Sequence, residues 1–191
     1  MPDLKGSQTE KNLLAAFSGE CQAHVRYAFF AKQAKKDGYE QIAHIFLETA
    51  EQERVHARRF HKFMDGLEAD VTLSMRSAGV GTTLENLKRS ASDEEREGGN
   101  DYPAAAAKAR EEGFMEAALV FENIALAEER HRARFQALAE NIEADRVFVR
   151  DSPVLWRCRH CGWAREAKAA PERCPACAHP KAHFEVSTEE W

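Results

Sequence analysis

The sequence predicts a mainly α-helical fold, a four-helix bundle followed by a small C-terminal metal-binding domain built on four cysteines. Apolar residues recur in steps of three and four over most of the first 142 residues, as on the buried face of a helix. A string near residue 50 returns near residue 125, which indicates an internal duplication. Four of the five cysteines lie between residues 158 and 177. We therefore expect a helical domain over 1–146 and a cysteine-built domain over 147–191.

Cap and turn residues delimit the first two helices. The first opens at Ser7 and Glu10, whose Ser-x-x-Glu spacing is typical of a capping box, and it ends at Gly38. The second runs from about Tyr39 to Met64. The connection that follows has roughly 15 residues, which is long for neighbouring antiparallel helices and predicts a crossover along the bundle.

The third helix starts near Thr83 and ends at Gly113, and the fourth spans 114–142. The third is irregular. Counting forward from its start places Glu94 on the buried face, whereas counting back from Tyr102 places Glu95 there. One inserted residue accounts for the disagreement, so we predict a π-bulge or a local break between Glu94 and Tyr102. Bulges of this kind often mark functional sites.

Two copies of a Glu-x-x-His pair lie on the buried stripes of the second and fourth helices. The string "AEQERVHARRF" at 50–60 contains Glu53 and His56, and "ALAEERHRARF" at 125–135 contains Glu128 and His131. The three-residue step puts both side chains of a pair on one helix face. Because an unpaired carboxylate is costly to bury, we expect cations among these side chains.

Carboxylates on the other two helices complete the donor set of a diiron centre. Such a centre takes one Glu from each of two helices and a Glu-x-x-His from each of the others. Glu20 lies on the first helix and Glu94 on the third, with Glu95 as the alternative register. Four carboxylates balance two ferrous ions, and carboxylate and imidazole donors suit iron. Glu97 follows Glu94 by three residues and is a candidate further ligand.

Other polar residues near these stripes have different expected roles. Tyr27 and Tyr102 are related by the repeat and are candidate hydrogen-bond donors to metal-bound carboxylates. We interpret His24 as a satisfied polar residue, not a ligand. Cys21 lies off the stripe, and we expect a small buried residue there.

The cysteines follow the pattern C-x2-C, twelve residues, C-x2-C, which is a strong signal for a tetrahedral metal site. The predicted ligands are Cys158, Cys161, Cys174 and Cys177. A structural zinc ribbon and a one-iron electron-transfer site share this geometry, so the pattern leaves the metal open. We expect the small core to be formed by Trp156, Trp163, Phe184 and Trp191.

Bulk properties exclude several classes of protein. The formal net charge of −5 argues against a broad nucleic-acid surface. No apolar run approaches the roughly 18 residues that a membrane helix needs. The first residues lack the apolar stretch of a secretory signal, so a cytoplasmic protein without membrane or nucleic-acid partners is the default expectation.

The chain resembles the rubrerythrin family over its whole length. The resemblance is carried by Glu20, Glu53-x-x-His56, Glu94-x-x-Glu97, Glu128-x-x-His131 and the rubredoxin-like "CRHCG" and "CPACAHPKAHFE". It implies a ferritin-like diiron bundle with a C-terminal rubredoxin-like domain that holds one more iron. It also implies reduction of hydrogen peroxide to water in oxidative stress defence. The electrons would come from rubredoxin or an NAD(P)H-dependent reductase through the cysteine-bound iron.

The resemblance also implies roles for particular residues. Glu53 and Glu128 would bridge the two irons, and one iron would exchange His56 for Glu97 on oxidation. Glu20 and Glu94 would be terminal ligands. We expect Glu97, Tyr27 and Tyr102 to act in catalysis, since two protonatable tyrosines in a buried site can help to protonate the leaving oxygen. A homodimer or higher homo-oligomer would bring one chain's cysteine site near another chain's diiron site. The sequence departs from the family pattern at the "GGND" stretch after Glu97 and at Ala178, where free-standing rubredoxins usually have glycine.

Two other functions stay open at this point. The first is ferroxidase activity or iron handling, as in ferritins, which needs no built-in electron relay. The second is a structural zinc protein with an empty or mixed-metal bundle. Zinc could occupy either site in a recombinant sample.

Overall fold

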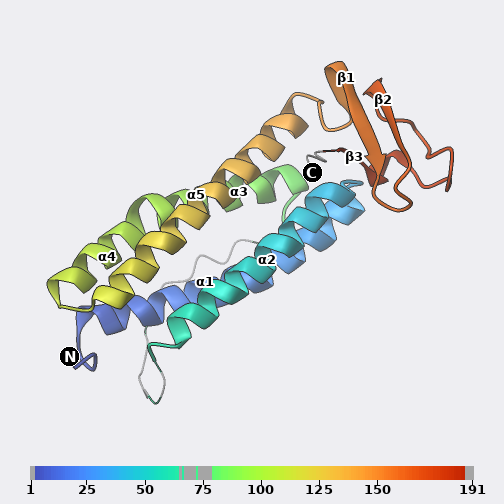
Figure 1. Cartoon of the computed structure of the whole chain (residues 1–191). Coiled ribbons are helices and arrows are strands. Elements are labelled where there is room, and N and C mark those ends of the chain that lie inside the picture. The colour runs from blue at the N-terminus through green and yellow to red at the C-terminus, as the bar shows by residue number, and fades with distance from the viewer. Residues whose placement is uncertain (1–2, 65, 67–71, 73–78, 188–191) are drawn as a thin grey trace.

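The computed structural model describes residues 3–64, 66, 72 and 79–187, and it has a helical bundle with a small β-domain at one end (Figure 1). The bundle contains α1 (Gln8–Lys36), α2 (Glu40–His61), α3 (Thr83–Arg96), the π-helix η1 (Glu97–Asp101), α4 (Tyr102–Glu111) and α5 (Met115–Glu143). The segments α3, η1 and α4 follow one another without a break and together form the third rod of a four-helix bundle. The predicted fold class is therefore confirmed.

Two carboxylates join the helical hairpin α1–α2 to the hairpin α3–α5. Asp37, at the end of α1, accepts hydrogen bonds from the backbone N–H and the hydroxyl of Thr83 at 2.9 and 2.6 Å. Glu112, at the end of α4, accepts from the same two groups of Thr9 at 2.8 and 2.6 Å. A carboxylate at a helix N-terminus satisfies free N–H groups and the helix dipole. These contacts are called the reciprocal caps below.

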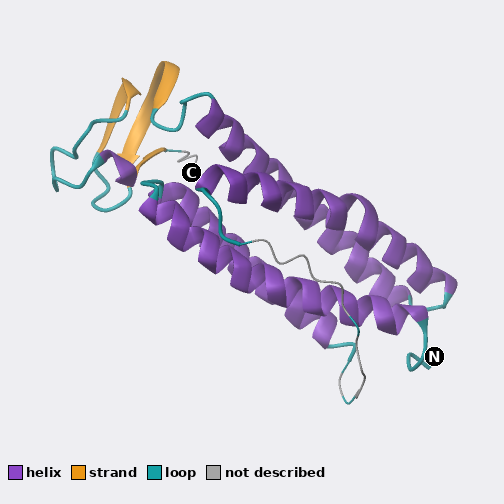
Figure 2. Cartoon of the chain, turned by 180° about the vertical axis from the view of Figure 1, so that it is seen from behind, coloured by secondary structure: helices purple, strands orange, loops and turns teal. Residues whose placement is uncertain are grey.

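The reciprocal caps also fix where the second hairpin begins. The start of α3 lies beside the turn between α1 and α2, whereas α2 ends at the opposite end of the bundle (Figure 2). The two helix ends that the connection joins therefore lie at opposite ends of the bundle, as the predicted crossover requires, and the crossover itself stays a prediction. Most of the connection itself lies outside the described residues.

The π-helix η1 confirms the bulge predicted between Glu94 and Tyr102. Its position settles the register, because Glu94 is 2% exposed whereas Glu95 lies on the surface. Gly98 allows the close approach of this segment to α5. A Cβ atom built on Gly98 would lie 2.9 Å from the carbonyl oxygen of Ala125 and 3.2 Å from the Cβ of Glu128. Any larger residue would have to push the two helices apart.

Two aromatic clusters flank the middle of the bundle and repeat each other. Tyr27, Phe46 and Phe135 have ring centroids 5.1–5.9 Å apart. Their partners in the repeat are Tyr102, Phe121 and Phe60, whose ring centroids lie 5.0–5.8 Å apart. All six side chains are buried. They seal a polar layer between two apolar ones and give the bundle an approximate two-fold symmetry.

Some local predictions were wrong. Ser7 does accept from the N–H of Glu10, but the Glu10 carboxylate reaches Gly6 and not Ser7, so the reciprocal capping box is absent there. Helix α2 ends at His61, before the predicted Met64. Cys21 is exposed, because its position on α1 faces away from the core. The C-cap glycine Gly38 has the expected positive φ of 86°.

The C-terminal domain is a three-stranded antiparallel sheet in the order β2-β1-β3. Its elements are β1 (Val149–Cys158), β2 (Ala164–Ala169), the 3-10 helix η2 (Lys181–His183) and β3 (Phe184–Val186). Trp156 and Phe184 form its buried core, as predicted, and Trp191 lies outside the described residues. The ring of Phe148 stacks on that of Tyr39 at 6.1 Å, which seats the domain on the turn between α1 and α2. The boundary at 146/147 stays a prediction.

None of the helices in the described part of the chain is long and apolar enough to cross a membrane.

Candidate metal centres

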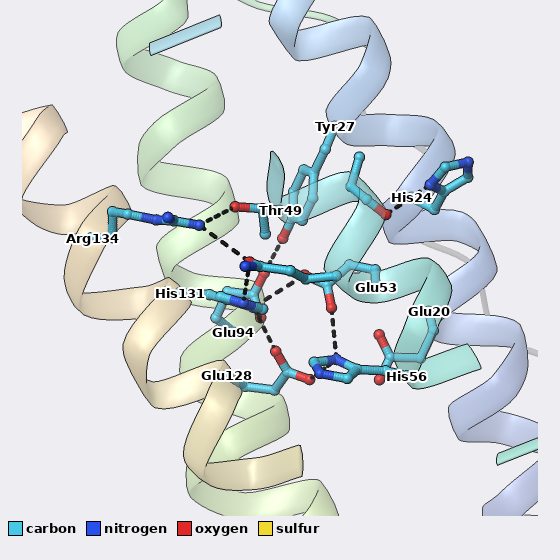
Figure 3. Close-up of polar contacts among 12 residues, drawn as sticks. Glu20, His24, Tyr27, Thr49, Glu53, His56, Glu94, Glu128, His131 and Arg134 are labelled. Atoms are coloured by element: carbon cyan, nitrogen blue, oxygen red, sulfur yellow. Dashed lines mark hydrogen bonds and ion pairs between the residues drawn. The ribbon is translucent and has the colours of Figure 1, made fainter. Parts of the chain in front are cut away.

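Six side chains from four rods of the bundle converge in its polar middle layer (Figure 3). Their donor atoms form two groups, in each of which all atoms lie within 4.8 Å of one another. One group is Glu20, Glu53, His56 and Glu128, and the other is Glu53, Glu94, Glu128 and His131. Glu53 and Glu128 belong to both groups. The geometry therefore suits two adjacent cations that share two carboxylates.

The hydrogen bonding of this layer fits side chains that bind cations. Several buried donor atoms have no hydrogen-bond partner, namely Glu20 Oε2, Glu53 Oε1, Glu94 Oε2, both carboxylate oxygens of Glu128 and His131 Nδ1. The Nδ1 of His131 lies 2.7 Å from Glu128 Oε2, yet the two atoms are not oriented for a hydrogen bond. Buried polar atoms are rarely left unpaired. Unpaired donor atoms that surround a common centre are typical of metal ligands.

The electrostatics lead to the same conclusion. Burial raises the pKa of Glu20 and of Glu94 well above the usual range, and the neighbouring carboxylates raise both further. Burial alone would lower the pKa of His56 and His131. The carboxylates of Glu128 and Glu53, which lie close to both rings, outweigh burial and raise these values to about 10 and about 9. When no metal ion is bound, these raised pKa values favour protonated side chains in this layer.

This proton dependence predicts how the metal-free protein responds to pH. A group whose pKa is higher in the folded than in the unfolded state stabilises the fold at pH values below its unfolded-state pKa, which is near 6.5 for histidine. This stabilisation is lost as the pH rises through the folded-state pKa. Carboxyl groups with raised pKa values act in the same direction. We expect the melting temperature of chelator-treated protein to fall between pH 6 and pH 9. A loss of about 2 kcal/mol would lower it by roughly 4–8 °C.

Calorimetry of chelator-treated and metal-loaded protein at both pH values tests this. The loaded protein is the control, since bound cations replace the protons and bind more tightly at high pH. A metal-free melting temperature that stays constant or rises over this range would contradict the assignment of charges.

The two tyrosines connect the hairpins across the polar layer. Tyr27 on α1 donates its hydroxyl proton to Glu94 on α3. Tyr102 on α4 donates to Glu20 on α1 at 2.5 Å. Burial, together with the adjacent carboxylate, raises the pKa of each hydroxyl well above its usual value. Both hydroxyls therefore stay protonated. They orient Glu94 and Glu20, the two carboxylates that each belong to a single donor group.

Glu97 lies at the rim of the layer and not inside either donor group. It begins the π-helix, its side chain is 14% exposed, and its carboxylate pairs with the guanidinium of Arg96 at 3.1 Å. Burial raises the pKa of Glu97 to about 7, and the charge of Glu128 contributes to the shift. Its expected role as a ligand stays a prediction.

Two residues on the outer side of the His131 ring were not predicted from the sequence. The Nε2 of His131 lies 3.0 Å from the side-chain oxygen of Gln52, and Arg134 contacts the same oxygen at 3.3 Å. Position 52 is glutamine in the first repeat, and its partner in the second repeat is Ala127. A comparison of the repeats position by position would have marked it. His24, as expected, is no ligand, because its Nδ1 lies 2.7 Å from the carbonyl oxygen of Ala50.

The four cysteines form the second candidate site. All four sulfur atoms lie within 4.8 Å of one another. The sulfurs of Cys158 and Cys177 are 3.8 Å apart, and those of Cys161 and Cys174 are 3.6 Å apart. Metal–sulfur bonds of about 2.3 Å give a tetrahedron with edges of about 3.8 Å, so the sulfurs fit one cation. Burial raises the pKa of the Cys174 thiol, but N–H groups of residues 176 and 177 donate to it and lower the value to about 7.

Two knuckle turns of nearly equal geometry carry these cysteines. The N–H of Gly162 donates to the carbonyl of Cys158, and that of Ala178 donates to the carbonyl of Cys174, both at 2.9 Å. Gly162 has a φ of 78° and Ala178 a φ of 59°. Ala178 thus adopts the left-handed conformation that glycine tolerates best.

Three histidines, which are exposed or partly exposed, lie close to one another beside the knuckle turns. The ring centroids of His160 and His179 are 3.6 Å apart, and that of His183 lies 4.8 Å from His179. They do not form a further metal site in the described part of the chain.

Comparisons with known proteins agree with both sites. A family model described as Rubrerythrin matches residues 11–139 and, in a second match, 85–154. A model of the rubrerythrin rubredoxin-like domain matches residues 156–185. The chain is 51% identical to a rubrerythrin of Nitratidesulfovibrio vulgaris over 191 residues, the full length of both proteins. It is also 51% identical to a rubrerythrin of Porphyromonas gingivalis over 182 residues, which cover 95% of this chain and 91% of the relative.

Solved structures give the same result. A nigerythrin in its fully reduced, all-ferrous state superposes with a TM-score of 0.63 at 32% identity, over 97% of this chain and 92% of that protein. Symerythrin from Cyanophora paradoxa superposes with a TM-score of 0.64 at 25% identity, over 75% of this chain and 89% of that protein. The ferritin-like bundle, the four-cysteine domain and the order of the two are thus shared over the full length. The chain belongs to the rubrerythrin family.

Proposed function

We propose that this chain is a non-haem diiron peroxidase that reduces hydrogen peroxide to water. The observation that carries the proposal is the presence of two different metal sites in one chain. One is built to hold a pair of cations in a buried layer, and the other is built to hold one cation in a sulfur tetrahedron at the surface. A metal pair that gives up two electrons must be reduced again, and the metal of the four-cysteine site could pass electrons to it. Membership of the family also points to an oxidoreductase.

The proposed ligands of the iron pair are Glu20, Glu53, His56, Glu94, Glu128 and His131, and those of the single iron are the four cysteines. The iron in the nigerythrin structure supports this choice of metal. Two ferrous ions would supply both electrons for breaking the peroxide O–O bond, and two protons complete the conversion of peroxide to two waters. Zinc in either site of a recombinant sample would be a substitution without this redox chemistry.

Side chains of the protein would orient the metal ligands and supply protons. Tyr27 and Tyr102 hold the terminal carboxylates by hydrogen bonds. The carboxyl of Glu97, with a pKa of about 7, can hold a proton at neutral pH and release it to a leaving oxygen. His56 lies at the edge of a groove of about 650 Å³ on the outer face of α2, which offers a small oxidant a way in.

The length of the bundle supports electron transfer between two copies of the chain. The cysteine domain contacts Tyr39 at the start of α2, and Glu53 follows 14 residues later, which is about 20 Å along a helix. Exposed apolar side chains on α1 and α2, including Phe29 and Val55, suit a homo-oligomeric contact. In a homodimer, the cysteine domain of one chain could lie closer to the iron pair of the other. The electrons would enter from rubredoxin or an NAD(P)H-dependent reductase.

Rapid mixing of the fully reduced protein with hydrogen peroxide tests the proposal. We expect both iron centres to oxidise, the pair first, and much faster than with dissolved oxygen. Cys174→Ser should leave the first oxidation of the pair intact and abolish sustained turnover with a reductase. Centres that stay reduced, or that oxidise no faster than with oxygen, would favour the alternative of ferroxidase or iron handling. Metal analysis that finds one zinc and no iron in natively produced protein would favour a structural zinc protein.

A further inference from the structure

The two metal positions are related by the repeat, but their surroundings differ on one side. At the position of His131, the ring is held at both nitrogens. Its Nδ1 faces Glu53 Oε1 at 3.1 Å and Glu128 Oε2 at 2.7 Å (Figure 3). Its Nε2 faces the Gln52 oxygen at 3.0 Å. The ring therefore has little freedom to rotate or withdraw.

Arg134 fixes the orientation of the Gln52 amide. Its guanidinium contacts Gln52 at 3.3 Å, Thr49 at 2.7 Å and the carboxylate of Glu48 at 3.0 Å. A guanidinium can only donate, so the Gln52 atom that faces it must be the oxygen. That oxygen must then accept from the Nε2–H of His131. The proton on Nε2 leaves the lone pair of Nδ1 free for a metal, and an acceptor behind a histidine ligand makes it a better donor.

The matching residues around His56 lack this support. The repeat places Ala127 where Gln52 would be, Ile124 in place of Thr49 and Asn123 in place of Glu48. Arg59, the partner of Arg134, pairs instead with Glu116 at 2.9 Å. Across the described residues, no group accepts a hydrogen bond from the Nε2 of His56, whose side chain is 14% exposed, against 7% for His131. The ring of His56 is therefore held only on its metal side.

We infer that Gln52 is a positioning residue that makes the two metal positions unequal. The position of His131 binds a divalent cation first and tightly, and the position of His56 binds second and exchanges its cation more readily. The inference rests on the metal pair proposed above. Loss of an outer partner of a histidine ligand typically weakens metal binding about 10- to 100-fold.

A cobalt(II) titration of the metal-free full-length chain tests the inference. The visible bands of cobalt bound by oxygen and nitrogen report the bundle, and sulfur-to-cobalt charge-transfer bands report the cysteine site separately. In the wild type we expect two bundle steps that differ at least about tenfold in affinity. Gln52→Leu should weaken the first step about 10- to 100-fold and merge the two steps. Gln52→Glu should restore the tight step, because a carboxylate can accept from both His131 and Arg134.

Gln136→Leu is the matched control, since Gln136 is an exposed glutamine on α5 whose side chain forms hydrogen bonds with Arg132 and Glu140, away from the donor groups. It should leave both steps unchanged. Proton NMR of the cobalt-loaded wild type should show one imidazole N–H that exchanges slowly with D2O, and this signal should be lost in Gln52→Leu.

Four outcomes would overturn the inference. Two equal bundle steps in the wild type would do so, as would a Gln52→Leu titration that matches the control. If Gln52→Leu does not fold, failure of Gln52→Glu to keep the slowly exchanging N–H decides against it. Absence of any oxygen- and nitrogen-bound cobalt would overturn the proposed metal pair as well.

Discussion

Glu128→Gln is expected to abolish metal binding at both bundle positions, whereas Glu20→Gln is expected to empty only one. Glu128 belongs to both donor groups, and Glu20 belongs to one. An amide has no charge to balance a divalent cation and offers one oxygen in place of two. Because even an outer-sphere partner is worth about 10- to 100-fold in affinity, losing a shared ligand should cost more than this at each position.

Metal content after dialysis against a weak chelator measures the effect. We expect Glu128→Gln to retain only the metal of the cysteine site and Glu20→Gln to retain one further ion. Glu129→Gln is the matched control, because Glu129 is the next residue on α5 and pairs with Arg132 outside the cluster. It should retain the full complement. Two bundle metals in Glu128→Gln would mean that the carboxylate does not bridge. Far-UV circular dichroism checks that each variant folds.

Gly98→Ala is expected to destabilise the metal-loaded protein by about 1–3 kcal/mol, the usual cost of overpacking a tight contact. The new methyl group would meet the carbonyl oxygen of Ala125 at 2.9 Å, so η1 and α5 must separate. Glu128 lies on the α5 side of this contact and Glu97 begins η1, so the change should also weaken metal binding.

Gly99→Ala is the control for this prediction. Its Cβ would have its nearest neighbour, the Glu129 carboxylate, at 3.8 Å, which is an ordinary contact. Removing a helical glycine there should be neutral or stabilise by up to about 1 kcal/mol. Urea unfolding of both variants, loaded with the same metal, gives the comparison. Equal midpoints would show that the approach of η1 to α5 tolerates a side chain.

The sequence predicted the parts of the structure that depend on periodicity. The spacing of Glu53, His56, Glu128 and His131 determines which helix face they share, and burial of that face brings them together. The π-helix could be predicted because the residue spacing in one repeat can be compared with that in the other. Tyr102 follows Glu94 by eight residues, whereas Tyr27 follows Glu20 by seven.

What could not be predicted depends on side-chain partners across helices. Spacing places Gln52 beside the cluster but does not say that Arg134 orients its amide toward His131. The capping pattern at Ser7 was present, yet Glu10 found a nearer donor in Gly6. Cys21 was expected to be buried from its residue type, although its helix position faces solvent. The position of Glu97 depends on how η1 packs, which neither spacing nor composition specifies.

The reciprocal caps have a consequence for how such a chain could arise. Each donor group draws ligands from both hairpins, so one hairpin alone could complete neither group. Two copies of an ancestral hairpin would complete both positions by self-association, and the contacts of Asp37 with Thr83 and of Glu112 with Thr9 are ones that such a pair would make twice. The present chain has the architecture of a fused homodimer, in which a covalent tether replaces concentration-dependent assembly. Fusion also freed the halves to diverge, so that a once symmetric pair could acquire two chemically distinct ions.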